Sequence, residues 1–152
     1  MNKIASFTVD HRKIKEGVYI SRTDGDIVTY DLRMRKPNTG DLLSNSAMHS
    51  LEHIFATMVR NSEMADKIIY YGPMGCQTGF YLLIRNSNHS QNLKLIKDTL
   101  KNIIEYNGEM PGASEIECGN YRNLDLAIAK HEAEVYYNKI VNNTIDDMRY
   151  PE

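Results

Sequence analysis

Four short runs of the chain are rich in apolar, β-branched and aromatic residues, which is typical of β-strands. The β-rich runs Val18–Arg22 and Ile27–Met34 flank an Asp-Gly turn, and Asp-Gly between such runs predicts a β-hairpin. Two later runs, Lys67–Tyr71 and Phe80–Arg85, predict two further strands on either side of a glycine-rich connection at residues 72–79. Connections this short join antiparallel strands, so an antiparallel sheet is expected.

A helical pattern of apolar residues follows in three other segments. Within residues 46–61, apolar side chains recur at positions i, i+3, i+4 and i+7. They are Leu51, Ile54, Phe55 and Met58. Two more helices are expected over residues 90–106 and 125–141, separated by a Gly/Pro-containing loop at 107–113 and a short extended piece at 116–118. The pattern predicts an α+β sandwich, an antiparallel sheet packed with helices, in a single domain over residues 1–152.

Composition narrows the functional classes. The 152 residues are 41% hydrophobic and 25% charged, which is typical of one globular domain. A net charge of -2 argues against a nucleic-acid partner, because such proteins need a basic face. No apolar run is long enough to span a membrane, and Met1–Phe7 lacks the apolar stretch of a secretory signal. A cytoplasmic location without a membrane partner is therefore expected.

The first predicted helix carries His49-Ser50-Leu51-Glu52-His53. Two histidines four positions apart lie about 40° apart around a helix, so both imidazoles can reach one metal ion. Glu52 lies on the neighbouring face, where it can act on a reactant without being a ligand. This H-x-x-E-H spacing is a known arrangement of metal ligands with a catalytic carboxylate. The same five residues also fit a solvated helix face with two surface histidines.

Two cysteines, Cys76 and Cys118, extend the metal hypothesis. A catalytic site commonly has three protein ligands and an open position, and two histidines with one thiolate meet that count. Composition alone leaves either cysteine as the ligand, and each also fits a small buried hydrophobic role. Cys76 lies on the glycine-rich turn, where nearby positive charge can activate an exposed thiol.

Longer stretches around these residues resemble the S-ribosylhomocysteine lyase (LuxS) family. The matching stretches are residues 6–11, 31–38, 48–53, 72–81 and 117–121. They follow the family's order from Ser6 to the last helix. Pro-Met-Gly-Cys-Gln-Thr-Gly-Phe-Tyr at residues 73–81 is the most specific stretch, because inverted-motif zinc peptidases share H-x-x-E-H.

The resemblance implies a role for each site residue. The implied metal ligands are His49, His53 and Cys118, the implied acid/base pair is Cys76 and Glu52, and the implied substrate pocket includes Ser6, His11 and Arg33. It also implies one divalent ion per chain, usually Fe²⁺ with Zn²⁺ or Co²⁺ able to replace it. The expected assembly is a homodimer with its active sites at the interface.

The implied activity is cleavage of S-ribosylhomocysteine to homocysteine and 4,5-dihydroxy-2,3-pentanedione. The second product is the precursor of the quorum-sensing signal autoinducer-2, and the reaction belongs to the activated methyl cycle. Many members carry Asp-x-Ser before Pro-Met-Gly-Cys, whereas this chain has Tyr70-Tyr71-Gly72. This departure calls into question an acidic contact to the sugar at position 70.

Two alternatives remain at this level. One is an inverted-motif metallopeptidase in which Glu52 activates a metal-bound water, although such enzymes usually take a downstream carboxylate as third ligand and are longer chains. The other is a small α+β binding module whose histidines are surface residues. Two histidines outside the motif, His89 and His131, are expected in a solvated loop and on the exposed face of the last helix.

Overall fold

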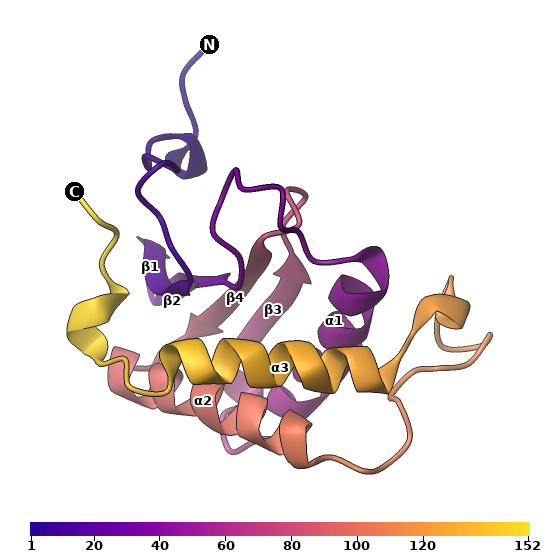
Figure 1. Cartoon of the computed structure of the whole chain (residues 1–152). Coiled ribbons are helices and arrows are strands. Elements are labelled where there is room, and N and C mark those ends of the chain that lie inside the picture. Colours follow the sequence, from indigo (N-terminus) through magenta and orange to yellow (C-terminus); the bar gives the residue numbers. More distant parts are fainter.

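The computed structural model describes residues 1–152 and arranges them as a sheet with helices on one of its faces (Figure 1). The strands are β1 (Gly17–Asp24), β2 (Ile27–Arg33), β3 (Ile68–Pro73) and β4 (Gly79–Arg85). They lie in the order β1-β2-β4-β3, and every neighbouring pair is antiparallel. Both predicted hairpins form, and β2 pairs with β4 to join them. The predicted α+β class is confirmed.

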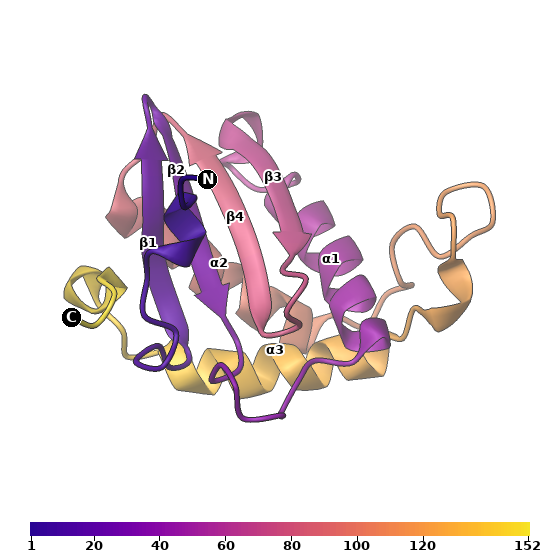
Figure 2. The same cartoon turned by 90° about the horizontal axis from the view of Figure 1, so that it is seen from above.

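Three helices cover one face of this sheet, and the N-terminal segment lies over the other (Figure 2). The helices are α1 (Asn45–Val59), α2 (His89–Glu105) and α3 (Leu126–Ile140). Each begins after a polar residue whose side chain accepts a hydrogen bond from a backbone N–H of the first turn: Ser44, Asn88 and Asp125. None of the helices combines the length and apolar character needed to cross a bilayer.

The core lies between the sheet and the helices. Alternate residues of the central strands point into it, such as Tyr30 and Leu32 on β2, and both are almost completely buried. Phe55 of α1 stacks on Tyr71 of β3 with ring centroids 4.2 Å apart. The predicted apolar stripe of α1 thus faces the sheet, which leaves the opposite face of the helix to carry the two histidines of the motif.

Two local predictions are wrong. Residues 116–118 form a turn rather than an extended piece, because the N–H groups of Glu117 and Cys118 both bond to the Ser114 carbonyl and no strand lies alongside to pair with them. His89 is the first residue of α2 rather than a loop residue. Its Nδ1 lies 2.7 Å from the hydroxyl of buried Tyr30. His131 is exposed on α3, as predicted.

Candidate active site

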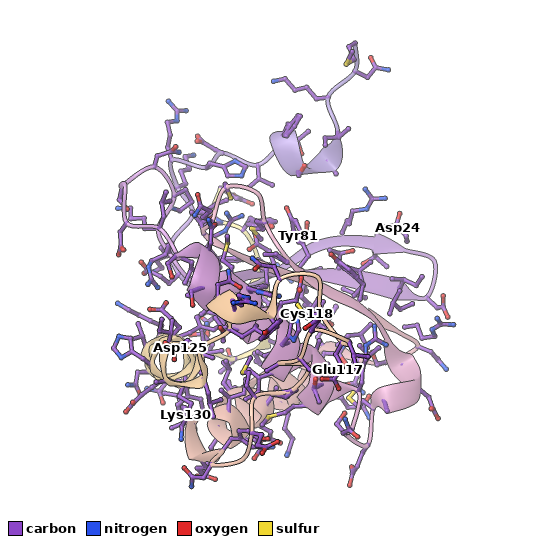
Figure 3. The ribbon with its side chains drawn as sticks, turned by 90° about the vertical axis from the view of Figure 1, so that its right-hand side faces the viewer. Asp24, Tyr81, Glu117, Cys118, Asp125 and Lys130 are labelled. Carbon is purple, nitrogen blue, oxygen red and sulfur yellow. The ribbon has the colours of Figure 1, made fainter.

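The structure brings His49, His53 and Cys118 together. The histidines lie on α1 and the cysteine lies on the segment between α2 and α3, which passes beside α1 (Figure 3). One ligand atom from each residue lies within 4.8 Å of the others, and Cys118 Sγ is 3.4 Å from His49 Nε2. Ligands bonded to one tetrahedral ion are separated by roughly 3.3–3.8 Å, given bond lengths of about 2.0–2.3 Å. The cluster therefore has nearly the spacing of a metal site.

Both imidazoles are held in the orientation that a metal requires. His53 Nδ1 lies 2.9 Å from the Pro111 carbonyl, and His49 Nδ1 lies 2.6 Å from Asn123 Oδ1. Because a carbonyl oxygen only accepts, the proton of each ring is on Nδ1 and the lone pair of Nε2 is free. The rings are half-buried and bonded on one side, rather than freely solvated on the helix surface. The chemistry of these donors fits a bound divalent ion.

The segment that carries Cys118 is fixed to α1 at several points. Ser50, buried in the middle of α1, accepts a hydrogen bond of 2.8 Å from the backbone N–H of Asp125. Gly112 adopts a φ of +68°, and a Cβ at this residue would lie 2.8 Å from His53 Nδ1. The position thus requires glycine both for its backbone and for the space that the imidazole occupies.

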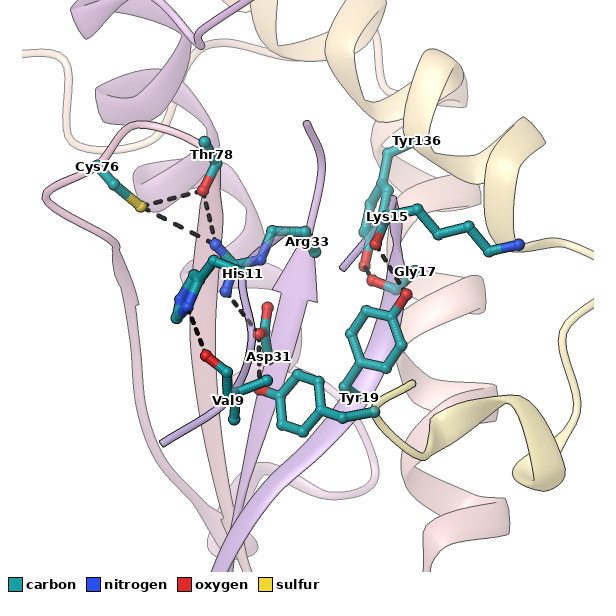
Figure 4. A network of polar contacts seen from close by, with 11 residues as sticks. Val9, His11, Lys15, Gly17, Tyr19, Asp31, Arg33, Cys76, Thr78 and Tyr136 are labelled. Atoms are coloured by element: carbon teal, nitrogen blue, oxygen red, sulfur yellow. Dashed lines mark hydrogen bonds and ion pairs between the residues drawn. The ribbon is translucent and has the colours of Figure 1, made fainter. Parts of the chain in front are cut away.

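Cys76 is exposed on the turn between β3 and β4, and not buried as a small hydrophobic residue. Its Sγ lies 3.0 Å from Thr78 Oγ1 and 4.0 Å from a terminal nitrogen of Arg33 (Figure 4). The same nitrogen donates to Thr78 Oγ1 at 2.7 Å, and the other terminal nitrogen donates to Asp31 at 2.7 Å. Arg33 is 2% exposed, so a nearly buried positive charge lies beside an accessible thiol.

The turn of Cys76 is also connected to the helix of the histidines. Gln77 and Leu43 exchange two hydrogen bonds, and Leu43 directly precedes the cap of α1. Glu52 is half-buried on α1, and its negative charge adds to the effect of burial in raising the pKa of the Tyr71 phenol on β3. Its helix packs against β3, the strand that leads into the Cys76 turn.

The other predicted pocket residues are not gathered in the same way. Ser6 lines a hollow of about 360 Å³ on the outer face of the sheet, together with Tyr70 and Tyr81. His11 precedes β1, and its Nδ1 lies 2.9 Å from the Val9 carbonyl (Figure 4). At position 70 the chain presents an exposed phenol, where the resemblance leads one to expect a carboxylate. The largest cavity, about 680 Å³ between the end of α1 and α2, contains none of the predicted site residues.

Sequence reasoning missed the residues that orient the site. Asp31 carries a usable signal, because it lies two positions before Arg33 on one strand and therefore on the same face. No sequence signal identifies the other orienting groups, because their roles depend on contacts between distant segments. These groups are Asn123, Thr78 and the carbonyl of Pro111.

Comparison with known proteins places this arrangement in a family. Residues 4–147 match the family described as S-Ribosylhomocysteinase (LuxS). The chain belongs to the LuxS family. Curated S-ribosylhomocysteine lyases from Desulfotalea psychrophila and Borreliella afzelii are 44% and 43% identical to it, each over 99% of this chain and at least 99% of the relative. A lyase of that name from Clostridium beijerinckii is 43% identical over 99% of each chain. The resemblance found in the sequence is confirmed.

Proposed function

We propose that this LuxS-family protein is an S-ribosylhomocysteine lyase, with one lyase domain over residues 1–152. The observation that carries the proposal is the His49–His53–Cys118 cluster, whose ligand atoms lie within 4.8 Å of one another. The relatives described above bear the same enzyme name over nearly their full length. The products would be homocysteine and 4,5-dihydroxy-2,3-pentanedione, the precursor of autoinducer-2.

We assign one divalent metal ion to the cluster, with His49, His53 and Cys118 as ligands. Two imidazoles and a thiolate suit Fe²⁺, Zn²⁺ or Co²⁺, and Fe²⁺ is the proposed resident ion. When bound, the ion would supply a Lewis acid that polarises the carbonyl and hydroxyl oxygens of the sugar. The Nδ1 hydrogen bonds of the two rings support this assignment, because they leave both Nε2 atoms free to bind.

We assign the proton transfers to Cys76 and Glu52. The sulfur of the substrate is not adjacent to the aldehyde, so carbonyl character must move along the ribose until the sulfur lies β to a ketone. Each move removes one proton beside a carbonyl and returns one nearby, after which homocysteine thiolate is eliminated. A general acid or base such as Cys76 or Glu52 typically accelerates a reaction by a factor of about 10² to 10⁴. Cys76 is accessible and lies next to the charge of Arg33, which supports its role.

We propose that Ser6, His11 and Arg33 contact the substrate and that the working unit is a homodimer. Large apolar side chains lie exposed on the N-terminal segment and the outer face of the sheet. They include Ile4, Phe7 and Tyr70, which are 57%, 67% and 52% exposed. Exposed apolar groups of this kind favour a protein partner. A cytoplasmic location is proposed as well, because both cysteines are free thiols and the site needs them reduced.

The metallopeptidase alternative is not favoured. The third side chain that meets the two histidines is the thiol of Cys118, whereas H-x-x-E-H peptidases usually use a carboxylate. The binding-module alternative expects free surface histidines, but both rings are half-buried and hydrogen-bonded.

The test is anaerobic purification followed by elemental analysis and a thiol-release assay with S-ribosylhomocysteine. Cys118→Ala should lose metal and activity together. Cys76→Ala and Glu52→Gln should keep the metal and lose turnover by about 10² or more, since each removes a proton-transfer group and no ligand. Glu134→Gln, at an exposed position on α3, is the control for Glu52→Gln and should retain full activity.

Two results would overturn these assignments. A metal-free Cys76→Ala together with a loaded Cys118→Ala would reverse the roles of the cysteines. Release of casein peptides with no release of thiol from S-ribosylhomocysteine would favour the peptidase.

The shared site is tested by complementation between two inactive variants, His11→Ala and His53→Ala. If His11 serves the site of the partner subunit, a mixed dimer contains one site with both lesions and one with neither. Random exchange makes about half the dimers mixed, so about a quarter of the wild-type rate should return. Light scattering should give twice the chain mass of 17.5 kDa. A fully active monomer would exclude the shared site.

A further inference from the structure

The orientation of Arg33 toward Cys76 depends on a buried carboxylate. Asp31 is completely buried on the outer face of β2, two residues before Arg33. Its Oδ2 accepts a hydrogen bond of 2.7 Å from one terminal nitrogen of Arg33. The other terminal nitrogen is left to contact Thr78 and Cys76. Whatever fixes the Asp31 carboxylate therefore also fixes the charge beside the thiol.

Tyr150 is the second partner of Asp31. It lies beyond α3, and its hydroxyl donates to the same Oδ2 at 2.7 Å. Its ring stacks on Tyr19, the residue opposite Asp31 on β1, with centroids 5.0 Å apart and planes at 19°. Burial, followed by the negative charge of Asp31, raises the pKa of Tyr150 far above its ordinary value. The phenol thus remains a donor throughout the working pH range.

Two buried atoms at this ion pair have no partner: Asp31 Oδ1 and Arg33 Nε. A carboxylate and a guanidinium usually pair through two parallel hydrogen bonds, which would use both of these atoms. In this structure both hydrogen bonds to Asp31 go to Oδ2 instead, one from a terminal nitrogen of Arg33 and one from the Tyr150 hydroxyl.

The segment that carries Tyr150 is itself well anchored. The short helix η4 (Ile145–Met148) begins with a reciprocal capping arrangement between Thr144 and Asp147. Met148 is completely buried, and η4 packs against β1. Two residues later, Tyr150 reaches Asp31 from a fixed position.

We propose that Tyr150 is a positioning residue, which acts through Asp31 to hold the Arg33 guanidinium against Cys76. The expected effect on catalysis rests on the proposed function, because Cys76 is the thiol assigned to proton transfer. The orientation of Arg33 does not depend on that assignment, and it can be tested without metal or substrate.

The decisive variant is Tyr150→Phe, which removes one hydroxyl and keeps the stacked ring. The matched control is Tyr137→Phe, because Tyr137 is half-buried on α3 and its hydroxyl makes no hydrogen bond. The first measurement is the rate at which iodoacetamide, which reacts with thiolates, modifies Cys76 at pH 7, followed by mass spectrometry of the Cys76 peptide. We expect about a tenfold lower rate in Tyr150→Phe, the scale of one hydrogen bond to a charged group, and no change in the control.

The second measurement is steady-state kinetics with S-ribosylhomocysteine. We expect kcat/KM to fall about tenfold in Tyr150→Phe, because the Arg33 guanidinium that the phenol holds in place lies beside the proton-transfer thiol and is also proposed to contact the substrate. Tyr150→Ala offers a rescue experiment. Added phenol should restore the alkylation rate, and added toluene, which fills the space without donating, should not.

The outcomes separate the two proposals. Alkylation of Tyr150→Phe within twofold of wild type, or equal rescue by toluene, would overturn the positioning role. Slow alkylation in Tyr150→Phe together with a wild-type protein that releases no thiol from S-ribosylhomocysteine would overturn the lyase assignment and leave the positioning of Arg33 standing.

Discussion

Among single residues, His53 shows how closely its neighbours determine what it can bind. Its ring is held by the carbonyl of Pro111, and the next residue, Gly112, leaves just enough space for it. The carbonyl fixes the tautomer, and the missing side chain of the glycine lets the backbone approach the ring. Both effects come from a loop more than fifty residues away along the chain.

Gly112→Ala should therefore weaken metal binding. The new Cβ would meet His53 Nδ1 at 2.8 Å in a backbone conformation that only glycine adopts easily. Loss of an orienting contact typically lowers metal affinity about 10- to 100-fold. Gly40→Ala is the control, because its φ of +82° carries the same backbone strain with no atom within 4 Å. Both variants should lose about 1 kcal/mol of stability, but only Gly112→Ala should lose metal in a competition assay with a chelator. Equal affinities in the two variants would contradict the role of Gly112.

A site residue can be predicted from the sequence when residues close to it in the chain are enough to define its role. His49 and His53 are predictable because helical spacing alone brings them together. Composition left Cys76 and Cys118 equivalent, and the resemblance separated them before the structure placed Cys118 at the histidines. Tyr150 carries no local signal, since its partner lies 119 positions earlier in the chain.

At the level of elements, an ion pair joins α3 to the connection between β2 and α1. Arg35 contacts Glu132 of α3 at 2.7 Å, and their side chains are only 15% and 10% exposed. The backbone N–H of Arg35 also bonds to the carbonyl of Thr78, beside the Cys76 turn. The pair therefore fixes one helix against the loop that borders the proposed site.

Glu132→Ala should lower the free energy of unfolding by about 2 kcal/mol, because it leaves Arg35 largely buried with only a peripheral partner. Urea denaturation measures the change. Asp98→Ala serves as the control, since it breaks the exposed ion pair with Lys94 on α2 and should produce no resolvable change. Similar losses in both variants would argue against a special role for the buried pair.

The elements themselves were largely predictable. The Asp-Gly hairpin, the second pair of strands and the three helices follow from periodicity and turn residues, to within a few positions at their ends. The pairing of β2 with β4 was not predictable, because residues 27–33 and 79–85 meet only through tertiary packing. Residues 116–118 were mistaken for an extended piece because three residues are too few to show a period.

In the molecule as a whole, tyrosine is the most abundant buried titratable residue. Burial raises the pKa of six of the ten tyrosines above the ordinary value of 10. They are Tyr19, Tyr30, Tyr71, Tyr81, Tyr136 and Tyr150. Their neutral phenols lie mostly in or beside the core, where a phenolate would be poorly solvated.

The protein should therefore lose stability in alkali. Because the folded-state pKa of these phenols is raised, their contribution is complete below pH 10 and is lost as pH rises above it. Phenolate absorbance at 295 nm should rise in two phases, with the second coinciding with loss of the circular dichroism signal. A single smooth phase with no change in circular dichroism would show that the buried phenols ionise without unfolding.

The placement of Cys118 against α1 has a consequence for the topology of the chain. An ion bound to both His53 and Cys118 would act as a crosslink, closing a loop that contains β3, β4, α2 and the long irregular segment after α2. Closing a long loop restricts the unfolded chain more than the folded one, as a disulfide does. Chelation would then resemble reduction of a disulfide: the midpoint of thermal unfolding should fall, and the exposed Arg122 near the end of the irregular segment should become the first site of trypsin cleavage.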